Sequence, residues 1–142
     1  MGLMKIDNVS YRYDGAGKNV LSGVSAEFVA GKVYAIVGKS GAGKSTLLSL
    51  LSGLDVCEQG AILYDGKDLK QIDRDVYRAK SVGVVFQSYN LLLNATAVEN
   101  IVLSMDISGV GSDVLGAMDK KAYAHKLLED VGIDRETAAG RF

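Results

Sequence analysis

The nine residues 38–46, with the sequence GKSGAGKST, constrain the fold of this chain more than any other stretch. They fit the phosphate-binding pattern G-x-x-x-x-G-K-[ST], whose fixed positions are occupied by Gly38, Gly43, Lys44 and Ser45. The apolar run 33–37 before the loop predicts a buried strand, and the leucine-rich run 47–51 after it predicts a helix that ends at Gly53. Strand, glycine-rich loop and helix in this order predict an α/β protein built around a phosphate-binding loop.

Each residue type in this loop suits contact with a nucleotide phosphate. Glycines let consecutive backbone N–H groups point inward around an anion, and the start of the following helix adds a partial positive charge. The amine of Lys44 can reach the β- and γ-phosphates, with each charge-assisted hydrogen bond worth about 1.5–3 kcal/mol. The Ser45 hydroxyl suits the Mg²⁺ ion that bridges those phosphates. The expected nucleotide contacts come from the whole loop: Gly38, Lys39, Ser40, Gly41, Ala42, Gly43, Lys44, Ser45 and Thr46.

Composition and length exclude several other classes of protein. The 142 residues are of single-domain size, and their formal net charge of −1 gives no reason to expect a basic face for nucleic acid. The single cysteine, Cys57, has no partner for an internal disulfide, which suits a reducing compartment. No run reaches the ~18 consecutive apolar residues that a membrane span needs, and the N-terminus does not resemble a signal peptide. We therefore expect a soluble intracellular domain.

The segments on either side of the loop predict an antiparallel sheet. Three runs favour strands, at 4–13, 20–29 and 61–64. The pair Asp65-Gly66 follows the third run and is a hairpin turn signal, because both residues tolerate positive φ. The later run 82–86 is apolar throughout, which predicts a strand buried on both faces that ends at Gln87.

Helices are expected at three further places, 73–79, from Thr96 to about residue 103, and 117–131. Thr96 and Glu99 have the spacing of a capping box. The last helix carries an apolar stripe that is expected to pack in the core, formed by Ala124, Leu127, Leu128 and Val131. Between these helices, the run 104–116 is rich in glycine and predicts a mobile connection.

Taken in order, these segments resemble the ATP-binding subunit of ABC transporters over essentially the whole chain. Tyr11-Arg12-Tyr13 before the loop resembles the aromatic loop of the family, which implies that Tyr13 rather than Tyr11 stacks on adenine. The alternative is that Tyr13 packs on the sheet. Gly53-Leu54-Asp55 and the turn at Asp65-Gly66 resemble the family's run into the front-sheet hairpin.

The third part of the resemblance is the run 82–87 with Leu91-Leu92 and 96–101, which is similar to the Q-loop and the lead-in to the helical subdomain. It implies that Gln87 is catalytic together with Lys44, because an amide oxygen can ligate Mg²⁺ or orient the attacking water. The expected metal contacts are therefore Ser45 and Gln87. The alternative is that Gln87 is a surface residue at the end of a strand.

The resemblance implies the front part of a P-loop NTPase cassette. An antiparallel β subdomain is expected at 1–32 and 60–72, a P-loop core at 33–53 and 80–87, and the start of a helical subdomain at 88–142. The signature motif, the Walker B strand that ends in Asp-Glu, and the switch histidine of the family do not occur in the chain, so the C-terminal part of the core is missing.

Three expectations follow from this truncation. The chain should bind Mg·ATP without turning it over efficiently. Its only histidine, His125, should be a surface residue rather than the switch histidine. The strands at 33–37 and 82–86 should have open edges that favour self-association, because the family's Asp-Glu strand and a later strand lie between them.

The function implied by the resemblance is that of an ATP-binding subunit whose intact form hydrolyses ATP to drive transport. Its expected partners are transmembrane permease subunits and a second ATP-binding subunit, with no nucleic acid. Its expected location is the cytoplasm, at the inner face of the membrane. The runs 53–55, 84–87 and 91–92 favour the lipoprotein-releasing and macrolide-export branch. Two alternatives stay open, a non-catalytic nucleotide-binding or interaction module and an ABC-type ATPase not coupled to transport.

Overall fold

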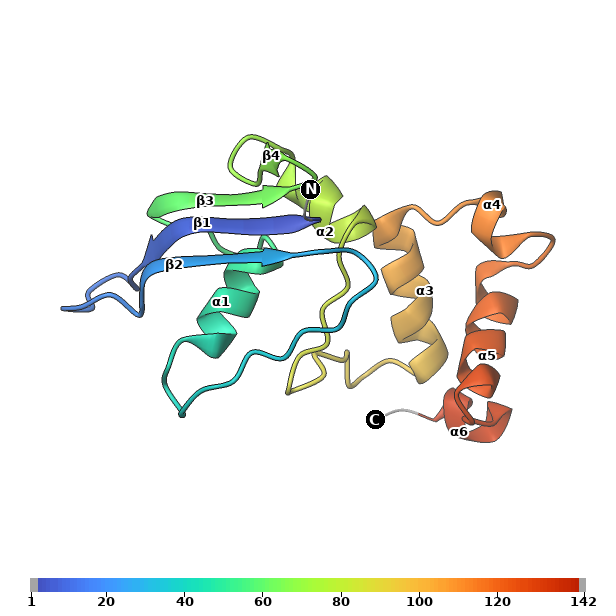
Figure 1. Cartoon of the computed structure of the whole chain (residues 1–142). Coiled ribbons are helices and arrows are strands. Elements are labelled where there is room, and N and C mark those ends of the chain that lie inside the picture. Colours follow the sequence, from blue (N-terminus) through green and yellow to red (C-terminus); the bar gives the residue numbers. More distant parts are fainter. Residues whose placement is uncertain (1–2, 141–142) are drawn as a thin grey trace. The chain divides into compact units, whose positions relative to one another are not determined.

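The computed structural model describes residues 3–140, which divide into two compact units between Gly83 and Val84. The first unit contains β1 (Met4–Tyr11), β2 (Leu21–Phe28), α1 (Lys44–Leu51), β3 (Gln59–Tyr64), β4 (Lys67–Asp68) and α2 (Arg74–Lys80), as drawn in Figure 1. The second unit contains α3 (Ala97–Ser108), α4 (Ser112–Leu115), α5 (Lys120–Asp130) and α6 (Arg135–Ala139). Each unit has its own hydrophobic core.

The first unit is organised around an antiparallel sheet with the strand order β2-β1-β3-β4. The sheet confirms the three strands predicted before and after the phosphate loop. It also confirms the hairpin between β3 and β4, where Asp65 and Gly66 have φ values of 47° and 78°. Figure 1 shows α1 lying along one face of this sheet, so the helix that follows the loop is packed on the strands that precede it.

Strand β1 supplies the centre of the first core. Ile6 and Val9 are fully buried and cluster with Leu50 of α1. Residues three apart on a regular strand point to opposite faces, but the register shift between Ile6 and Val9 brings both into the same core. At this irregularity a Cβ on Gly60 of β3 would lie 2.4 Å from the carbonyl oxygen of Asn8, so the close approach of the strands requires glycine.

Helix α1 ends in a glycine motif, as predicted from Gly53. Gly53 has a φ of 74°, and the N–H groups of Gly53 and Leu54 donate to the carbonyl oxygens of Leu50 and Ser49, both at 3.1 Å. This pair of hydrogen bonds satisfies carbonyl groups that would otherwise be unpaired at a helix end.

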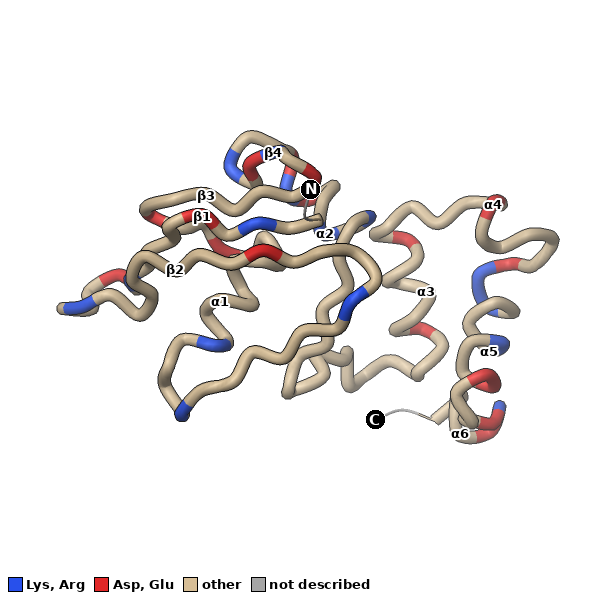
Figure 2. The backbone as a smooth tube through the Cα atoms, in the orientation of Figure 1, with Lys and Arg blue, Asp and Glu red and all other residues tan. Residues whose placement is uncertain are grey.

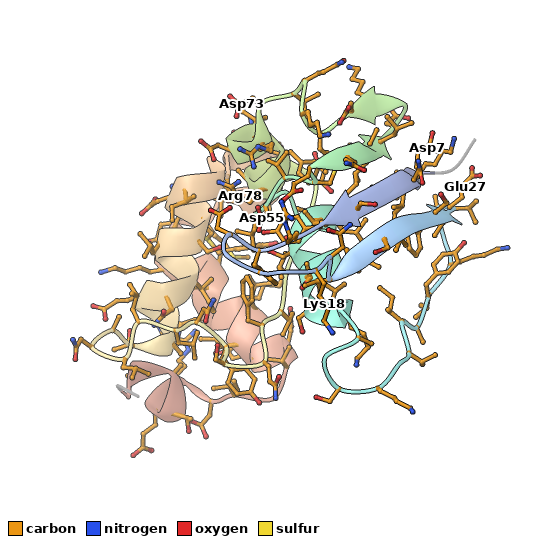
Figure 3. All side chains as sticks on the ribbon, turned by 90° about the vertical axis from the view of Figure 1, so that its left-hand side faces the viewer. Asp7, Lys18, Glu27, Asp55, Asp73 and Arg78 are labelled. Carbon is orange, nitrogen blue, oxygen red and sulfur yellow. The ribbon has the colours of Figure 1, made fainter. Side chains whose placement is uncertain are left out.

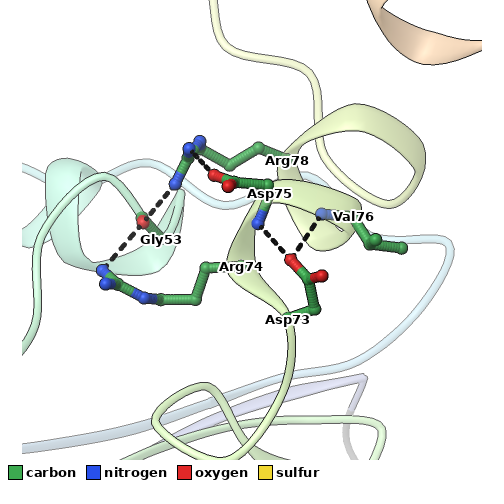
Figure 4. A network of polar contacts seen from close by, with 6 residues as sticks. All are labelled: Gly53, Asp73, Arg74, Asp75, Val76 and Arg78. Atoms are coloured by element: carbon green, nitrogen blue, oxygen red, sulfur yellow. Dashed lines mark hydrogen bonds and ion pairs between the residues drawn. The ribbon is translucent and has the colours of Figure 1, made fainter.

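Two arginines fasten α2 to this end of α1 (Figure 4). Arg74 and Arg78 donate to the carbonyl oxygen of Gly53 at 3.4 and 3.0 Å. Cations are favourable here because the last carbonyl groups of a helix carry partial negative charge. Arg78 also pairs with Asp75, while Asp73 caps α2 by accepting from the N–H of Asp75 at 2.9 Å. The far end of the phosphate-loop helix is therefore held in place.

The two apolar runs predicted as buried strands, 33–37 and 82–86, join no sheet within residues 3–140. Val33 is fully exposed and Val85 is 93% exposed, so the prediction of buried strands is wrong. A strand needs a partner strand beside it to satisfy its N–H and C=O groups, and the antiparallel sheet that is present does not include these runs. The expectation that these runs favour self-association stays a prediction.

In the second unit, α3 begins with the capping box predicted for Thr96 and Glu99. The N–H of Glu99 donates to Oγ1 of Thr96 at 3.1 Å, and the N–H of Thr96 donates to the Glu99 carboxylate at 2.8 Å. The helix passes the predicted end near residue 103 and stops at Gly109, which has a φ of 67°. Regular structure therefore occupies part of the run 104–116 that was expected to be mobile, and α4 occupies a further part.

The second core lies among α3, α5 and α6, with Val98, Met105, Ala124, Leu128 and Ala138 buried in it. Of the apolar stripe predicted on α5, Leu127 and Val131 are exposed, so that half of the prediction is wrong. Residues at i and i+4 share a helix face, which lets Ala124 and Leu128 pack together while the other pair lies on the neighbouring face. Helix α6 is not among the predicted helices, and Asp134 caps it by accepting from the N–H of Thr137 at 2.7 Å.

The charge pattern and the helix lengths bear on possible partners. Figure 2 shows Lys and Arg interspersed with Asp and Glu in both units. Among residues 3–140, none of the helices is long and apolar enough to cross a membrane. The same residues contain no group of three His, Cys, Asp or Glu side chains that could hold a metal ion.

Candidate phosphate-binding site

Residues 38–46 form the loop that leads into α1, and two of its glycines have backbone conformations that favour glycine. Gly41 and Gly43 have φ values of 76° and 87°, a region that residues with a Cβ rarely adopt. A Cβ on Gly43 would also lie 2.8 Å from Cδ2 of Leu21. The loop therefore packs directly on the start of β2, and its path depends on glycine.

Lys44, the first residue of α1, folds back over the loop. Its amine donates to the carbonyl oxygens of Gly38 and Lys39, each at 2.8 Å. An ammonium group has three donors, so this arrangement leaves one of them for a further acceptor. The first turn of α1 carries no acidic residue, so the positive end of the helix is not neutralised locally. The loop thus presents a fixed cation and a helix N-terminus together, which is suited to an anion.

The two hydroxyl residues after Lys44 have different surroundings. Ser45 is exposed, whereas Thr46 is 6% exposed. An exposed hydroxyl at the start of the helix fits a Mg²⁺ ion whose other ligands are phosphate oxygens, because Mg²⁺ prefers oxygen ligands and is commonly shared with substrate phosphates. The donor set of the loop therefore fits a magnesium nucleotide.

Tyr13 lies beside the loop. Its hydroxyl is 2.8 Å from Oγ1 of Thr46, and the two groups share a hydrogen bond. Tyr13 is 48% exposed, and its ring meets the ring of Tyr11 edge to face with 5.1 Å between centroids. The structure thus brings Tyr13 and the phosphate loop together, although they are far apart in the sequence. Stacking of Tyr13 on a base stays a prediction.

Tyr11, whose ring contacts Tyr13, makes a hydrogen bond that was not predicted from the sequence. The buried hydroxyl of Tyr11 donates to the carboxylate of Asp55, which also accepts from the N–H of Val56 at 2.8 Å. Figure 3 shows Asp55 within the first unit, whereas Asp7 and Glu27 lie at its edge. The hydrogen bond to Asp55, together with burial and the charge of Asp55, raises the pKa of Tyr11 to about 12. No local sequence signal marks this contact, because Tyr11 and Asp55 are 44 residues apart.

Gln87 belongs to the second unit, where it is exposed in a turn at 87–90. Beyond this turn the chain is held by Asn100 of α3, whose side chain accepts from the N–H of Leu92 at 2.8 Å and donates to its carbonyl oxygen at 3.1 Å. The contact of Gln87 with Mg²⁺ or water stays a prediction. His125 on α5 is half-buried rather than fully exposed, and its Nδ1 is buried without a hydrogen-bond partner.

The chain matches a known protein family. A sequence model described as ABC transporter matches residues 21–141. That range contains the phosphate loop and all of the second unit up to its penultimate residue. It begins after Tyr13, so the aromatic loop lies outside the matched range.

Similar proteins include ATP-binding proteins of both import and export systems. The ABC transporter ATP-binding protein YclH of Bacillus subtilis is 39% identical over 97% of this chain and 59% of its own length. The methionine import ATP-binding protein MetN 2 of Enterococcus faecalis is 36% identical over 97% of this chain and 40% of that protein. The macrolide export ATP-binding/permease protein MacB of Neisseria gonorrhoeae is 35% identical over 94% of this chain and 21% of that protein.

Among solved structures, the chain is similar to the ATP-binding cassette MJ0796, described as a dimer in a post-hydrolysis state bound to ADP and Pi. The TM-score is 0.83 and the sequences are 27% identical, with 97% of this chain and 61% of that one covered. The chain therefore spans about 60% or less of the length of each of these proteins.

Proposed function

The chain belongs to the ABC transporter family, and on this basis we propose that it is the nucleotide-binding front part of a transporter's ATP-binding subunit. The observation that supports this most directly is the position of the Lys44 amine, held by two carbonyl oxygens at 2.8 Å across a loop of glycines. A cation fixed in this way at a helix N-terminus suits the phosphates of ATP.

The proposed roles follow the chemistry of each side chain. The loop residues 38–46 surround the phosphates, and Lys44 neutralises charge at the β- and γ-positions. The Ser45 hydroxyl would ligate Mg²⁺, and the Gln87 amide oxygen would either ligate the same ion or orient the attacking water. Tyr13 stacks on the adenine, a contact for which its half-exposed ring is available. When bound, Mg²⁺ supplies charge stabilisation at the transferring phosphoryl group.

Hydrolysis and transport belong in this proposal to a longer protein. The relatives extend well beyond the length of this chain, and we propose that the signature motif, the Asp-Glu strand and the switch histidine lie outside residues 1–142. The domain division at 1–32 and 60–72, 33–53 and 80–87, and 88–142 is part of the same proposal. The exposed runs 33–37 and 82–86 then gain strand partners from the rest of the cassette, and self-associate without it.

The proposed partners are transmembrane permease subunits and a second ATP-binding subunit, which would place the protein at the inner face of the membrane. MetN 2 and MacB, named for import and export, match this chain at 36% and 35% identity, so neither branch is favoured. A non-catalytic module and an ATPase not coupled to transport would both use the same loop. If the longer protein hydrolyses ATP, the non-catalytic module is excluded. If that hydrolysis depends on a permease, the ATPase not coupled to transport is excluded.

Magnesium dependence tests the proposed binding site. ATP affinity is measured by equilibrium dialysis with and without Mg²⁺, for the chain itself and for Ser45→Ala. We expect Mg²⁺ to raise the ATP affinity of the parent chain and to raise that of Ser45→Ala by less. If the parent chain binds no ATP under either condition, the proposal is wrong for this chain.

A further inference from the structure

We propose that Tyr11 and Asp55 are positioning residues for the nucleotide base, because they hold the ring of Tyr13 in place through hydrogen bonding and ring contact. This inference rests on the proposed function, since it assigns the support of the base-binding side of that site. It concerns two residues that lie in the first unit but outside the phosphate loop.

The first contact is between Asp55 and Tyr11. Tyr11 ends β1 and is only 8% exposed, and its hydroxyl donates to the carboxylate of Asp55 in the loop after α1. A buried hydroxyl bound to a carboxylate keeps one orientation, because turning away would leave both groups unsatisfied. The ring of Tyr11 is therefore fixed in its plane.

The second contact is between the rings of Tyr11 and Tyr13, and it restricts the orientation of the Tyr13 ring. The planes of the Tyr11 and Tyr13 rings meet at 89°, with centroids 5.1 Å apart. Such an edge-to-face arrangement is a preferred geometry for aromatic pairs. A single neighbouring ring covers at most one face of Tyr13, and the 48% exposure of Tyr13 agrees with a free face. That face is available for a base.

The third contact ties the other end of Tyr13 to the phosphate loop. Its hydroxyl shares a hydrogen bond of 2.8 Å with Thr46, in the first turn of α1. Thr46 lies in the first turn of α1 and Asp55 in the loop after its last turn. The contacts Asp55–Tyr11–Tyr13–Thr46 therefore connect the two ends of this helix through the two tyrosines. A base stacked on Tyr13 would in this way be set at a fixed distance from the phosphates held by the loop.

The sequence separation of the partners supports a specific arrangement rather than local packing. Tyr11 and Asp55 are 44 residues apart, and Tyr13 and Thr46 are 33 residues apart. Gly43 at the start of α1 packs on Leu21 of β2, and Leu21 pairs with Tyr11 at the end of β1. The base side and the phosphate side of the site are thus assembled by the same elements.

The test compares ATP with inorganic tripolyphosphate, both with Mg²⁺, by calorimetric titration into the 142-residue chain. Tripolyphosphate lacks the base, so it reports on the phosphate loop alone. Tyr11→Phe removes the hydroxyl and keeps the ring. We expect it to weaken ATP binding about three- to tenfold, as for the partial loss of an aromatic contact, and to leave tripolyphosphate binding unchanged.

Tyr77→Phe is the matched control. Tyr77 is also a buried tyrosine, and its hydroxyl donates to the carbonyl oxygen of Leu51 at 2.8 Å, at the C-terminal end of α1. Tyr77 has no contact with Tyr13 among those described. Tyr77→Phe should therefore not change the affinity for ATP relative to that for tripolyphosphate. Asp55→Asn serves as a second variant, which retains an acceptor for Tyr11, and it should weaken ATP binding less than Tyr11→Phe does.

A double-variant comparison separates positioning from support of the fold. In a Tyr13→Leu background, the further change Tyr11→Phe should have no additional effect on ATP affinity, because Tyr11 acts through Tyr13. Equal weakening of ATP and tripolyphosphate by Tyr11→Phe, or no effect on either, would overturn the inference. A parent chain that binds tripolyphosphate and ATP equally would also overturn it. Absence of all binding by the parent would instead refute the proposed function.

Discussion

The amine of Lys44 lies 2.8 Å from the carbonyl oxygen of Gly38, so the last part of the phosphate loop is bonded back to its first residue. This contact closes the loop on itself. It depends on the backbone path between the two residues, which includes two glycines with positive φ. The shape of the loop is therefore a property of its own sequence and of the strand against which it packs.

Gly43 is the residue at which this shape is most sensitive to a side chain. Gly43→Ala would place a Cβ 2.8 Å from Leu21 in a conformation with a φ of 87°. We expect a loss of about 1–2 kcal/mol in the free energy of unfolding from the left-handed backbone and about 1–3 kcal/mol more from overpacking. Urea denaturation measures the total.

Gly41→Ala is the control for that substitution. Gly41 has a similar φ of 76°, but no atom lies within 4 Å of its added Cβ. It should therefore show the backbone cost without the packing cost. Equal losses for the two variants would contradict the packing of the loop on β2.

Asn100 is expected to hold the segment after Gln87 through the backbone of Leu92. Asn100→Ala removes an acceptor at 2.8 Å from the Leu92 N–H and a donor at 3.1 Å from its carbonyl oxygen. Hydrogen exchange at the Leu92 amide should become faster, because that N–H loses its partner. Asn100→Asp keeps the acceptor, so it should preserve much of the protection of this amide. Unchanged exchange at Leu92 in Asn100→Ala would refute this role.

The pH dependence of stability should reflect Tyr11. Its pKa is raised from 10.0 to about 12 in the folded chain, first by the hydrogen bond to Asp55 and then by burial. The neutral hydroxyl is the form that the fold favours, so its contribution to stability is complete below pH 10 and is lost as the pH rises through about 12.

The measurement is the difference in unfolding free energy between the parent chain and Tyr11→Phe across this range. The difference should be constant at about pH 8–9, where Tyr11 is neutral in both states, and should shrink as the pH rises through 10 toward 12. A difference that persists undiminished at the highest pH would mean that the Tyr11 hydroxyl is not the titrating group.

Self-association is expected from the exposed apolar runs. Val33 and Val85 lie in apolar segments that join no sheet among residues 3–140, and both side chains are exposed. Sedimentation velocity should show oligomers that grow with concentration. Val33→Lys and Val85→Lys should reduce them, because charge on an open edge opposes pairing. Val131→Lys, at an exposed position after α5, is the control, and a monomer at high concentration would count against the prediction.

Much of the fold could be predicted because its signals are local. The Asp65-Gly66 turn, the capping box of Thr96 and Glu99, and the glycine end of α1 each depend on residues within a few positions of one another. The runs 33–37 and 82–86 were predicted as strands from apolar composition alone. A strand depends on partner strands that can be distant in the sequence, so the composition of the run could not decide whether it joins a sheet.

The candidate site likewise contains a part with a local sequence signal and a part that depends on distant residues. The phosphate loop could be found from its spacing, since its chemistry lies within nine consecutive residues. The contact between Tyr11 and Asp55 joins residues 44 apart and depends on how α1 packs on β1. Neither residue type marks such a contact by itself, so it becomes visible only in the three-dimensional structure.

The central claim is that the loop at 38–46 binds Mg·ATP, and calorimetric titration of Mg·ATP with a lysine variant tests it most directly. The chain is compared with Lys44→Ala and with Lys32→Ala, which removes an exposed lysine outside the loop. We expect saturable binding by the parent chain and by Lys32→Ala, and none by Lys44→Ala. Binding of equal affinity by Lys44→Ala would contradict the account.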